Sequence, residues 1–214
     1  MNFQALPVVE SSKALLDIAF RTARRKGQER DLKGSWIEII QKKESLKIDI
    51  IQYALSSRLR IYLEVFPKEL ELPPFYVRLL HLTVDYVTFK KSMGALSWAI
   101  QKLQFFQREY VARINKTSDA VKIREFSKQF YGRVSSILKQ INPNLEYLEH
   151  CRKIMKSYPD VKDMFTVCVY GFPNVGKTTL LNKLTGTKAK TAAYAFTTKS
   201  INAGYFTIDD HTAQ

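Results

Sequence analysis

The sequence contains few cysteines and few glycines, and it has no apolar run long enough to span a membrane. Its 214 residues include 2 cysteines, Cys151 and Cys168, and 8 glycines. The cysteines have no CxxC spacing and no histidine cluster nearby, which argues against a disulfide framework or a metal centre. The N-terminus also lacks the basic and then apolar layout of a signal peptide. We therefore expect an intracellular protein that resides in a reducing compartment.

Acidic residues are also scarce relative to basic ones. The chain has 34 Lys+Arg against 20 Asp+Glu, a formal net charge of +14, and its pI is near 9.7. Only +3 of this charge lies from Gly171 onward, so most of the excess belongs to the first part of the chain. A basic excess of this kind favours a polyanionic partner, of which nucleic acid is the commonest.

Apolar residues recur at spacings of three and four through the first 160 or so residues, which is typical of helices with one buried face. Five or six helices fit this pattern, three of them long. An antiparallel bundle is the natural way to cover their apolar faces. The three clearest series are Ile48, Ile51, Leu55, Leu59, Tyr62, Phe66; Phe89, Met93, Leu96, Ile100, Leu103, Phe106, Tyr110; and Ile123, Phe126, Phe130, Val134, Ile137, Ile141.

Local signals place the ends of these helices. Ser35 and Glu38 have the spacing of a capping box, and Pro73-Pro74 separates one helix from the next. Asn142-Pro143 predicts an N-cap followed by a first-turn proline. The charged stretch at 157–163 predicts a boundary, with a bundle over 1–163 and a second domain over 164–214.

Two groups of basic residues stand out on the predicted helices. For any one of them a solvated helix surface is sufficient explanation, but together they favour a surface for RNA or another phosphate backbone. Aromatic residues at helical spacing, such as Phe130 and Trp98, are interpreted as core and not as base-stacking platforms. The first group is Arg21, Arg24, Arg25, Lys26, Arg30 and Lys33, and the second is Lys122, Arg124, Lys128, Arg133 and Lys139.

Residues 171–178 read Gly-Phe-Pro-Asn-Val-Gly-Lys-Thr, a complete GxxxxGK[ST] phosphate-binding loop. The apolar run at 165–170 before it predicts a buried strand, and 179–184 after it predicts a helix. In such a loop backbone N–H groups point into one concavity beside the helix N-terminus, which attracts anions. Lys177 would reach the β- and γ-phosphates, and the Thr178 hydroxyl would bind Mg²⁺.

Further along, Ala193-Tyr194-Ala195-Phe196-Thr197-Thr198 precedes a second predicted strand at 201–208. In switching GTPases a threonine in this position contacts Mg²⁺ and the γ-phosphate, and it orders the loop in the triphosphate state. From the residues alone, a polar surface loop explains the segment equally well.

The string GFPNVGKTTLLNKLTG followed by AYAFTT resembles the phosphate loop and switch I of the Obg-related GTPases, whose pattern is G-[YF]-P-N-V-G-K-[ST]-[ST] and then Y-P-F-T-T. The long helical region before it, with FYGRV at 130–134 and NLEYL at 144–148, is similar to the nucleolar GTP-binding protein (Nog) family in its shorter archaeal form. This resemblance covers essentially the whole chain. It implies an α + α/β fold, in which an antiparallel helical bundle precedes the first part of a Ras-like P-loop GTPase domain.

The resemblance also implies a function, namely a GTPase that binds GTP or GDP with Mg²⁺ and acts in maturation of the large ribosomal subunit. The expected partners are large-subunit rRNA and its precursor particle. The protein is expected to be a monomer, cytoplasmic if archaeal and nucleolar if eukaryotic. Residues that match the family's phosphate-binding loop are Gly171, Asn174, Val175, Gly176, Lys177, Thr178 and Thr179, and Thr198 matches the switch threonine that shares Mg²⁺ with Thr178.

Two departures from the family pattern qualify this expectation. Ala195 stands where the family has a proline, so a stiff turn before Thr198 is lost. No DxxG turn follows the second predicted strand and no NKxD segment reads guanine, so we expect a fragment that does not hydrolyse GTP by itself. Two alternatives stay open, which are a noncatalytic rRNA-binding module and an ATP-dependent kinase or ATPase, although AFTT disfavours the second.

Overall fold

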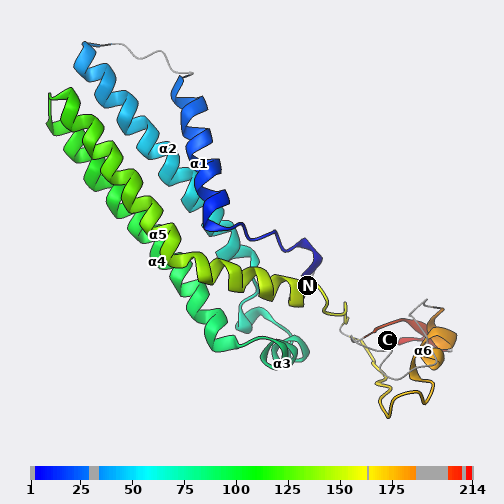
Figure 1. Cartoon of the computed structure of the whole chain (residues 1–214). Helices are drawn as coiled ribbons and strands as arrows, with labels where there is room; N and C mark the ends of the chain where they lie inside the picture. Colours follow the sequence, from blue (N-terminus) through cyan, green and yellow to red (C-terminus); the bar gives the residue numbers. More distant parts are fainter. Residues whose placement is uncertain (1–2, 29–33, 163, 187–201, 209–210, 214) are drawn as a thin grey trace. The chain divides into compact units, whose positions relative to one another are not determined.

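The computed structural model describes residues 3–28, 34–162, 164–186, 202–208 and 211–213. These residues fall into two units, Leu6–Lys153 and a second formed by Met1–Ala5 with Ile154–Gln214 (Figure 1). The elements, in chain order, are η1 (Phe3–Ala5), α1 (Ser12–Gln28), α2 (Trp36–Val65), η2 (Glu69–Glu71), α3 (Pro74–Thr83), α4 (Tyr86–Lys116), α5 (Ala120–Met155), α6 (Lys177–Thr185), β1 (Phe206–Ile208) and β2 (His211–Ala213).

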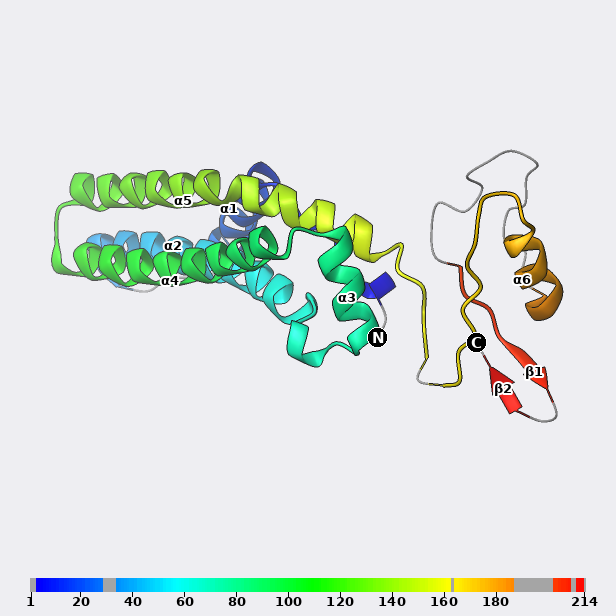
Figure 2. The ribbon, with the colours of Figure 1, turned by 90° about the horizontal axis from the view of Figure 1, so that it is seen from below.

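The first unit is the predicted antiparallel helical bundle. Its three long helices, α2, α4 and α5, contain 30, 31 and 36 residues. Helix α2 packs against both α1 and α4, and α4 and α5 run side by side (Figures 1 and 2). The predicted α-helical content and the three long helices are therefore confirmed.

The core consists of the predicted apolar series. Nearly all of these residues are buried, and only Met93, Phe106 and Phe126 are half-buried. Phe130 is fully buried and its ring lies 6.0 Å from that of Tyr110 on α4, centroid to centroid. Trp98 is half-buried. The core interpretation of the series is therefore correct.

Two of the three predicted helix boundaries are also correct. Ser35 caps α2 through a complete capping box, with its hydroxyl accepting from Glu38 N and the Glu38 carboxylate accepting from Ser35 N. Helix α3 begins at Pro74 with Pro73 as its N-cap residue. A first-turn proline loses no hydrogen bond, because its N–H would have had no partner within the helix.

The third predicted boundary, at Asn142-Pro143, is wrong, because α5 continues through it from Ala120 to Met155. Pro143 has no N–H to donate to the carbonyl of Lys139, and its ring crowds that carbonyl, so a helix that continues must bend. Figure 1 shows α5 changing direction partway along its length. Asn142 instead accepts a hydrogen bond from Ser12 N (3.0 Å) at the start of α1 and donates one to Glu146 (2.6 Å).

In the second unit, the N-terminal residues pack against the segment that follows α5. Gln4 donates to the carbonyl of Lys156 (2.7 Å), and the Phe3 ring meets the Tyr158 ring edge to face at 5.2 Å. Strands β1 and β2 pair antiparallel, with Phe206 opposite Ala213. Of the described residues in the strand predicted at 201–208, residues 206–208 form β1 and residues 202–205 do not belong to a strand.

The buried strand predicted at 165–170 is also wrong. This stretch has no regular secondary structure, and the side chains of Phe165 and Tyr170 are 76% and 89% exposed. A strand is held by hydrogen bonds to a neighbour, and within the described residues the single sheet contains only β1 and β2. The helix predicted at 179–184 is confirmed as α6.

Candidate functional site

The loop at 171–176 owes its shape to three residues with positive φ. Gly171 has φ +154°, Asn174 +64° and Gly176 +90°. Glycine adopts this half of conformational space without penalty, and asparagine is among the few other residues that tolerate the left-handed region. The loop can therefore curl on itself within six residues, which is the shape that turns successive N–H groups inward.

Lys177 follows the loop as the first residue of α6, and its side chain folds back over the loop. The Nζ atom donates to the carbonyl oxygens of Gly171 (2.9 Å) and Phe172 (2.6 Å). Two carbonyl contacts hold the ammonium group at the mouth of the loop, although they do not neutralise its charge. An anion in the loop would thus meet a positive group that is already in position.

Helix α6 adds a second source of positive potential. Its first intrahelical bond runs from Leu180 N to Gly176 O (2.9 Å), so the N–H groups of the first turn have no acceptor within the helix. Together with the helix dipole, such groups attract phosphate. Val175 in the loop and Thr179 on α6 are exposed, and Thr178 on α6 is half-buried, so the predicted phosphate-binding residues occupy the loop and the first turn of α6.

A phosphate group fits the chemistry of this segment, because the Lys177 ammonium and the N-terminus of α6 lie at the loop and residues 171–179 contain no acidic side chain. Thr198 and Ala195, in the predicted switch segment, lie outside the described residues. No group of three His, Cys, Asp or Glu residues suited to a metal ion occurs in the described part of the chain. Within that same part, no helix is long and apolar enough to cross a bilayer.

The first basic group lies on the C-terminal half of α1, where Arg21, Arg24, Arg25 and Lys26 are all exposed. Arg30 and Lys33 lie outside the described residues. Helix α1 runs antiparallel to α5, since Ser12 contacts Asn142 while Phe20 contacts Tyr131 (ring centroids 5.3 Å apart). The C-terminal half of α1 therefore faces the N-terminal half of α5.

The residues of the second basic group do not share one surface, because they lie on two flanks of α5. Tyr131 marks the flank toward α1, whereas the Arg133 guanidinium lies over the Phe106 ring of α4 at 5.9 Å. These two residues are about 200° apart around the helix. Arg124 and Lys128, seven and three positions before Tyr131, share the flank toward α1. Lys122 lies three turns before Arg133 and shares the flank toward α4.

The structure thus brings part of the second group together with the first. Lys128 lies one turn beyond the Phe20–Tyr131 contact on α5, and Arg24 lies one turn beyond it on α1, at the same level of the antiparallel pair. We call this set the α1–α5 basic surface, and its members are Arg21, Arg24, Arg25, Arg124 and Lys128. Lys26 is two positions from Arg24, about 200° around α1, and lies on the other side of that helix.

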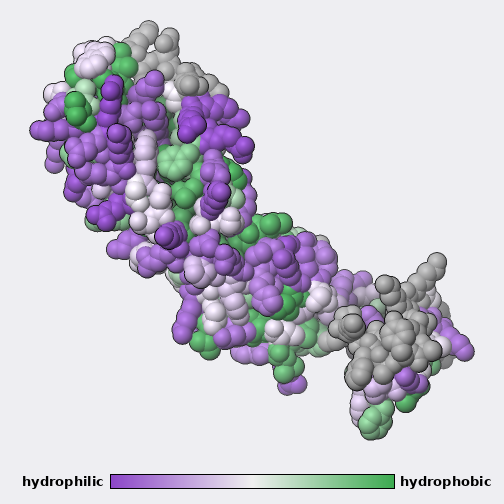
Figure 3. Space-filling model, viewed as in Figure 1, coloured by the Kyte–Doolittle hydropathy of each residue, from purple (hydrophilic) through white to green (hydrophobic). Residues whose placement is uncertain are grey.

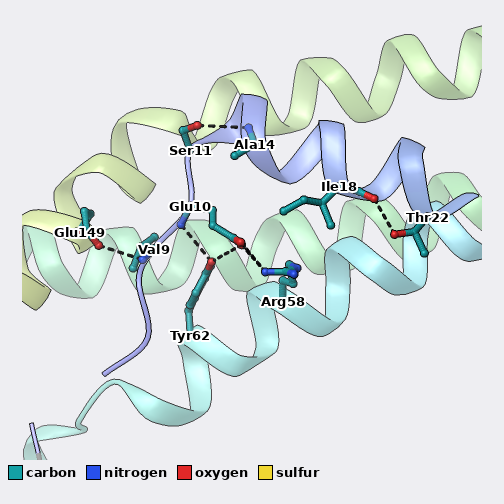
Figure 4. A network of polar contacts seen from close by, with 9 residues as sticks. All are labelled: Val9, Glu10, Ser11, Ala14, Ile18, Thr22, Arg58, Tyr62 and Glu149. Carbon is teal, nitrogen blue, oxygen red and sulfur yellow. Dashed lines mark hydrogen bonds and ion pairs between the residues drawn. The ribbon is translucent and has the colours of Figure 1, made fainter. Parts of the chain in front are cut away.

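A polar network that no sequence pattern predicts anchors the N-terminal segment to the bundle (Figure 4). Arg58 Nη1 lies 2.6 and 2.7 Å from the two oxygens of Glu10, and the Tyr62 hydroxyl donates to the same carboxylate (3.0 Å). Burial is the main cause that raises the pKa of Tyr62 to about 12. Glu10 and Arg58 are 48 positions apart, so no local pattern relates them.

The same segment is tied to α5. Val9 N donates to Glu149 (3.0 Å), as Figure 4 shows. The Arg152 guanidinium makes two contacts of 2.7 Å with the same carboxylate. The bond from Arg152 is the main cause that holds the pKa of Glu149 below its usual value. Leu6 and Val9 are buried, so the segment is both packed and hydrogen-bonded.

Two protein families match successive parts of the chain. Residues 3–162 match the family described as NOG1 N-terminal helical domain, and residues 166–214 match the family described as 50S ribosome-binding GTPase. An uncharacterized protein of Methanocaldococcus jannaschii is 35% identical over 204 residues, which cover 95% of this chain and 58% of the relative. Nucleolar GTP-binding protein 1 is 30% identical in Drosophila melanogaster and 29% in Arabidopsis thaliana, each over 95% of this chain and 31% of the relative. The chain therefore spans less than two thirds of the length of these curated relatives.

Proposed function

The chain belongs to the NOG1 family, and from that premise we propose that it acts as a GTP-binding GTPase in the assembly of the large ribosomal subunit. One observation carries the proposal. The loop at 171–176 turns through three positive-φ residues, and the Lys177 ammonium is held at its mouth by the carbonyls of Gly171 and Phe172. In this proposal residues 1–163 form a basic partner-binding domain and residues 164–214 belong to the nucleotide-binding domain.

Each residue of the loop has a role in binding the triphosphate. The loop N–H groups and the first turn of α6 would bind the β- and γ-phosphates, and Lys177 would move from the two carbonyls to the phosphate oxygens. The Thr178 and Thr198 hydroxyls would hold Mg²⁺, which when bound neutralises phosphate charge. Hydrolysis would proceed by in-line attack of water on the γ-phosphate, with Lys177 and the loop amides stabilising the developing charge.

The basic bundle is proposed to bind large-subunit rRNA. The α1–α5 basic surface offers five exposed cations on two adjacent helices, and Lys122 and Arg133 extend the basic character to the opposite flank of α5. Contacts to phosphate supply most of the affinity of basic surfaces for nucleic acid, without reading sequence.

Nucleotide binding is tested with fluorescently labelled GTP and GDP on the 214-residue chain and on its Lys177→Ala variant. We expect the variant to bind GTP more weakly by about 1.5–3 kcal/mol, the range for a hydrogen bond to a charged group. The matched control is Lys183→Ala, which removes an exposed lysine from the last turn of the same helix. Equal affinities in all three proteins would contradict the assignment of the loop.

The 214-residue chain is expected to bind GTP without hydrolysing it. No DxxG turn follows the second strand and no NKxD segment occurs in these 214 residues, so neither the attacking water nor the guanine is positioned by them. We expect phosphate release at the background rate. Release that saturates with GTP and disappears in Lys177→Ala would contradict this expectation.

A second candidate function is a noncatalytic rRNA-binding module. It is favoured by the contrast between a bundle with a full core and a helix α6 with no buried residue. The two candidates differ in one measurement, the effect of nucleotide on affinity for large-subunit rRNA. A GTPase switch requires that GTP and GDP give different affinities, whereas a simple binding module gives the same affinity with either.

A further inference from the structure

Phe105 on α4 is 58% exposed, although the same helix has a well-buried core face. Leu103 and Tyr110 lie on that core face and are buried, and Phe105 lies on roughly the opposite side of the helix. Figure 3 shows mainly hydrophilic side chains over the long helices on the face that it displays. A single exposed apolar side chain is common on protein surfaces, so the surroundings of the ring decide what it can bind.

The Phe105 ring belongs to an open hollow on this outer side of α4. The hollow has a volume of about 470 Å³ and is lined by Gln101, Gln104, Phe105, Arg108 and Glu109. This spacing places the lining residues on one face of the helix. The volume lies within the range of roughly 300–1,000 Å³ for small-ligand sites. The hollow therefore offers an aromatic ring, two amides and a guanidinium on one surface.

Cations lie next to the aromatic rings of this surface. The Lys102 Nζ atom is 5.9 Å from the centre of the Phe105 ring, near the outer limit of a cation–π contact, and it leaves the ring exposed. Phe105 meets Phe106 edge to face at 5.4 Å, and the Arg133 guanidinium of α5 lies 5.9 Å from the Phe106 ring. Interleaved rings and cations are typical of surfaces for single-stranded nucleic acid, where bases stack on the rings and phosphates meet the cations.

The acidic side chains near the hollow do not cancel its positive charge. Glu109, which lines the hollow, is paired with Arg113 one turn further along α4. Asp49 on α2 accepts a hydrogen bond from Gln107 (2.7 Å), which lies about 200° around α4 from Phe105. One carboxylate is therefore neutralised by its own partner, and the other lies on a different side of the helix.

The basic side chains near the hollow are available to a ligand. Lys102 and Arg108 form no ion pair within the described residues. Residues 126–140 of α5 lie alongside this part of α4, through contacts such as that of Phe130 with Tyr110, and they contain no acidic residue. An anion at the hollow would therefore be attracted, and nucleic acid combines anions with flat rings.

From this arrangement we propose that the hollow binds an unpaired nucleotide of RNA, whose base stacks on the Phe105 ring. The proposal rests on RNA binding by the bundle and adds a contact that selects unpaired bases. The amides of Gln101 and Gln104 would bind the edge of the base, and the cations of Lys102 and Arg108 would bind the neighbouring phosphates. Duplex RNA is disfavoured here, because its bases are stacked on one another. A protein partner is also disfavoured, because a single ring among amides and cations lacks the apolar neighbours of an interface core.

The proposal is tested by fluorescence anisotropy with the 214-residue chain and end-labelled oligouridylate of about ten nucleotides, a strand whose bases are unpaired. The comparison strand is abasic and carries the same number of phosphates. We expect the chain to bind oligouridylate at least about fivefold more tightly, the lower end of the range for one base stacked on an aromatic side chain. Equal affinities for the two strands would overturn the proposal, because only the bases differ.

Two substitutions assign the preference for bases to the ring. In Phe105→Leu, which keeps an apolar side chain without an aromatic face, the two strands should bind almost equally. Phe105→Tyr should retain the preference, and so should the matched control Phe75→Leu, at a phenylalanine of α3 that is 40% exposed. Helical circular dichroism verifies that all three variants fold, as surface changes of this kind should allow. A preference that persists in Phe105→Leu, or that Phe75→Leu also abolishes, would overturn the assignment.

Duplex RNA separates failure of this site from failure of the proposed function. Wild type and Phe105→Leu should bind a duplex equally, and a loss in Phe105→Leu as large as that for oligouridylate would overturn selection of unpaired bases. A wild-type chain that binds the duplex but does not distinguish the two strands would overturn this site alone. A chain that binds none of these RNAs would overturn RNA binding by the bundle as well. Self-association that Phe105→Leu abolishes, measured by sedimentation, would assign the ring to a second copy and overturn the proposal.

Discussion

The helical bundle and the phosphate-loop segment meet the same physical requirement in different ways. Apolar side chains and buried backbone groups need partners, and in the bundle the helices bury their apolar side chains against one another. Helices satisfy their own backbones, and their apolar faces cover one another through contacts such as Phe130 with Tyr110. In the segment at 164–186 most side chains are exposed and α6 buries none.

This difference shows which elements can form from their own residues and which need a partner elsewhere in the chain. A helix needs only its own sequence for its hydrogen bonds, whereas a strand needs a neighbour. The loop at 171–176 belongs with the helix in this respect, because glycine conformations and the Lys177 contacts are local. The loop therefore has a defined shape beside residues 165–170, which lack a strand partner within the described part of the chain.

The comparison predicts that core truncation costs far more in the bundle than in α6. Phe130→Ala should lower the free energy of unfolding by about 3–5 kcal/mol, since it removes a fully buried ring and leaves a cavity. Leu180→Ala, at an exposed position of α6, should change it by less than about 0.5 kcal/mol. Urea unfolding followed by circular dichroism at 222 nm measures both. Similar losses in the two variants would mean that α6 shares the core of the bundle.

The same contrast explains which features could be predicted from the sequence. The apolar series, the Ser35 capping box and the phosphate loop follow from spacing and from residue type, and all are found in the structure. The helix start at Asn142-Pro143 failed because packing on both sides carries α5 through the proline. The contact between Glu10 and Arg58 had no local signal, because it depends on how distant elements meet. The buried strand at 165–170 could not be predicted from apolar content alone, since burial requires a partner.

Acid should weaken the bundle through Glu149. Its pKa is depressed in the folded chain, chiefly by Arg152, so its stabilising contribution is fully present above the unfolded value of about 4.3 and is lost as pH falls through the folded value. The expected loss is about 1.5–3 kcal/mol, the range for hydrogen bonds to a charged group. Urea unfolding between pH 7 and pH 3 measures it. Glu149→Gln should lose less stability over that range, and an identical profile would contradict the assignment.

Replacing glycine by alanine should weaken GTP binding at the phosphate loop but stabilise the fold in the bundle. At Gly176, with φ +90°, alanine is strained by about 1–2 kcal/mol although no atom crowds its Cβ, so affinity for labelled GTP should fall. At Gly132, inside α5 and equally uncrowded, alanine should raise the free energy of unfolding by about 0.5–1 kcal/mol. Nucleotide titration and urea unfolding test both variants. Unchanged GTP affinity in Gly176→Ala would show that the loop does not need its left-handed glycine to bind phosphate.

The smallest effect on stability is expected for the basic residues of α1. Their replacement should change affinity for RNA without changing the stability of the bundle. Replacing Arg21, Arg24, Arg25 and Lys26 with Gln should leave helical content and unfolding nearly unchanged, because exposed charges contribute little to stability. Affinity for large-subunit rRNA should nevertheless fall. If the four side chains bind phosphates, the dependence of log K on log salt should flatten by up to about 0.9 for each phosphate that is no longer neutralised, the value for duplexes.

The two flanks of α5 supply the control for this experiment. Lys122→Gln/Arg133→Gln removes two cations from the flank toward α4, away from the α1–α5 basic surface. A flatter salt dependence in the four-Gln variant alone would assign rRNA to the side where α1 meets α5. A flatter dependence in the Lys122/Arg133 variant alone would move the rRNA to the opposite flank. If the dependence of log K on log salt is unchanged in both variants, these residues are a solvated surface, because each cation that binds a phosphate must release counterions.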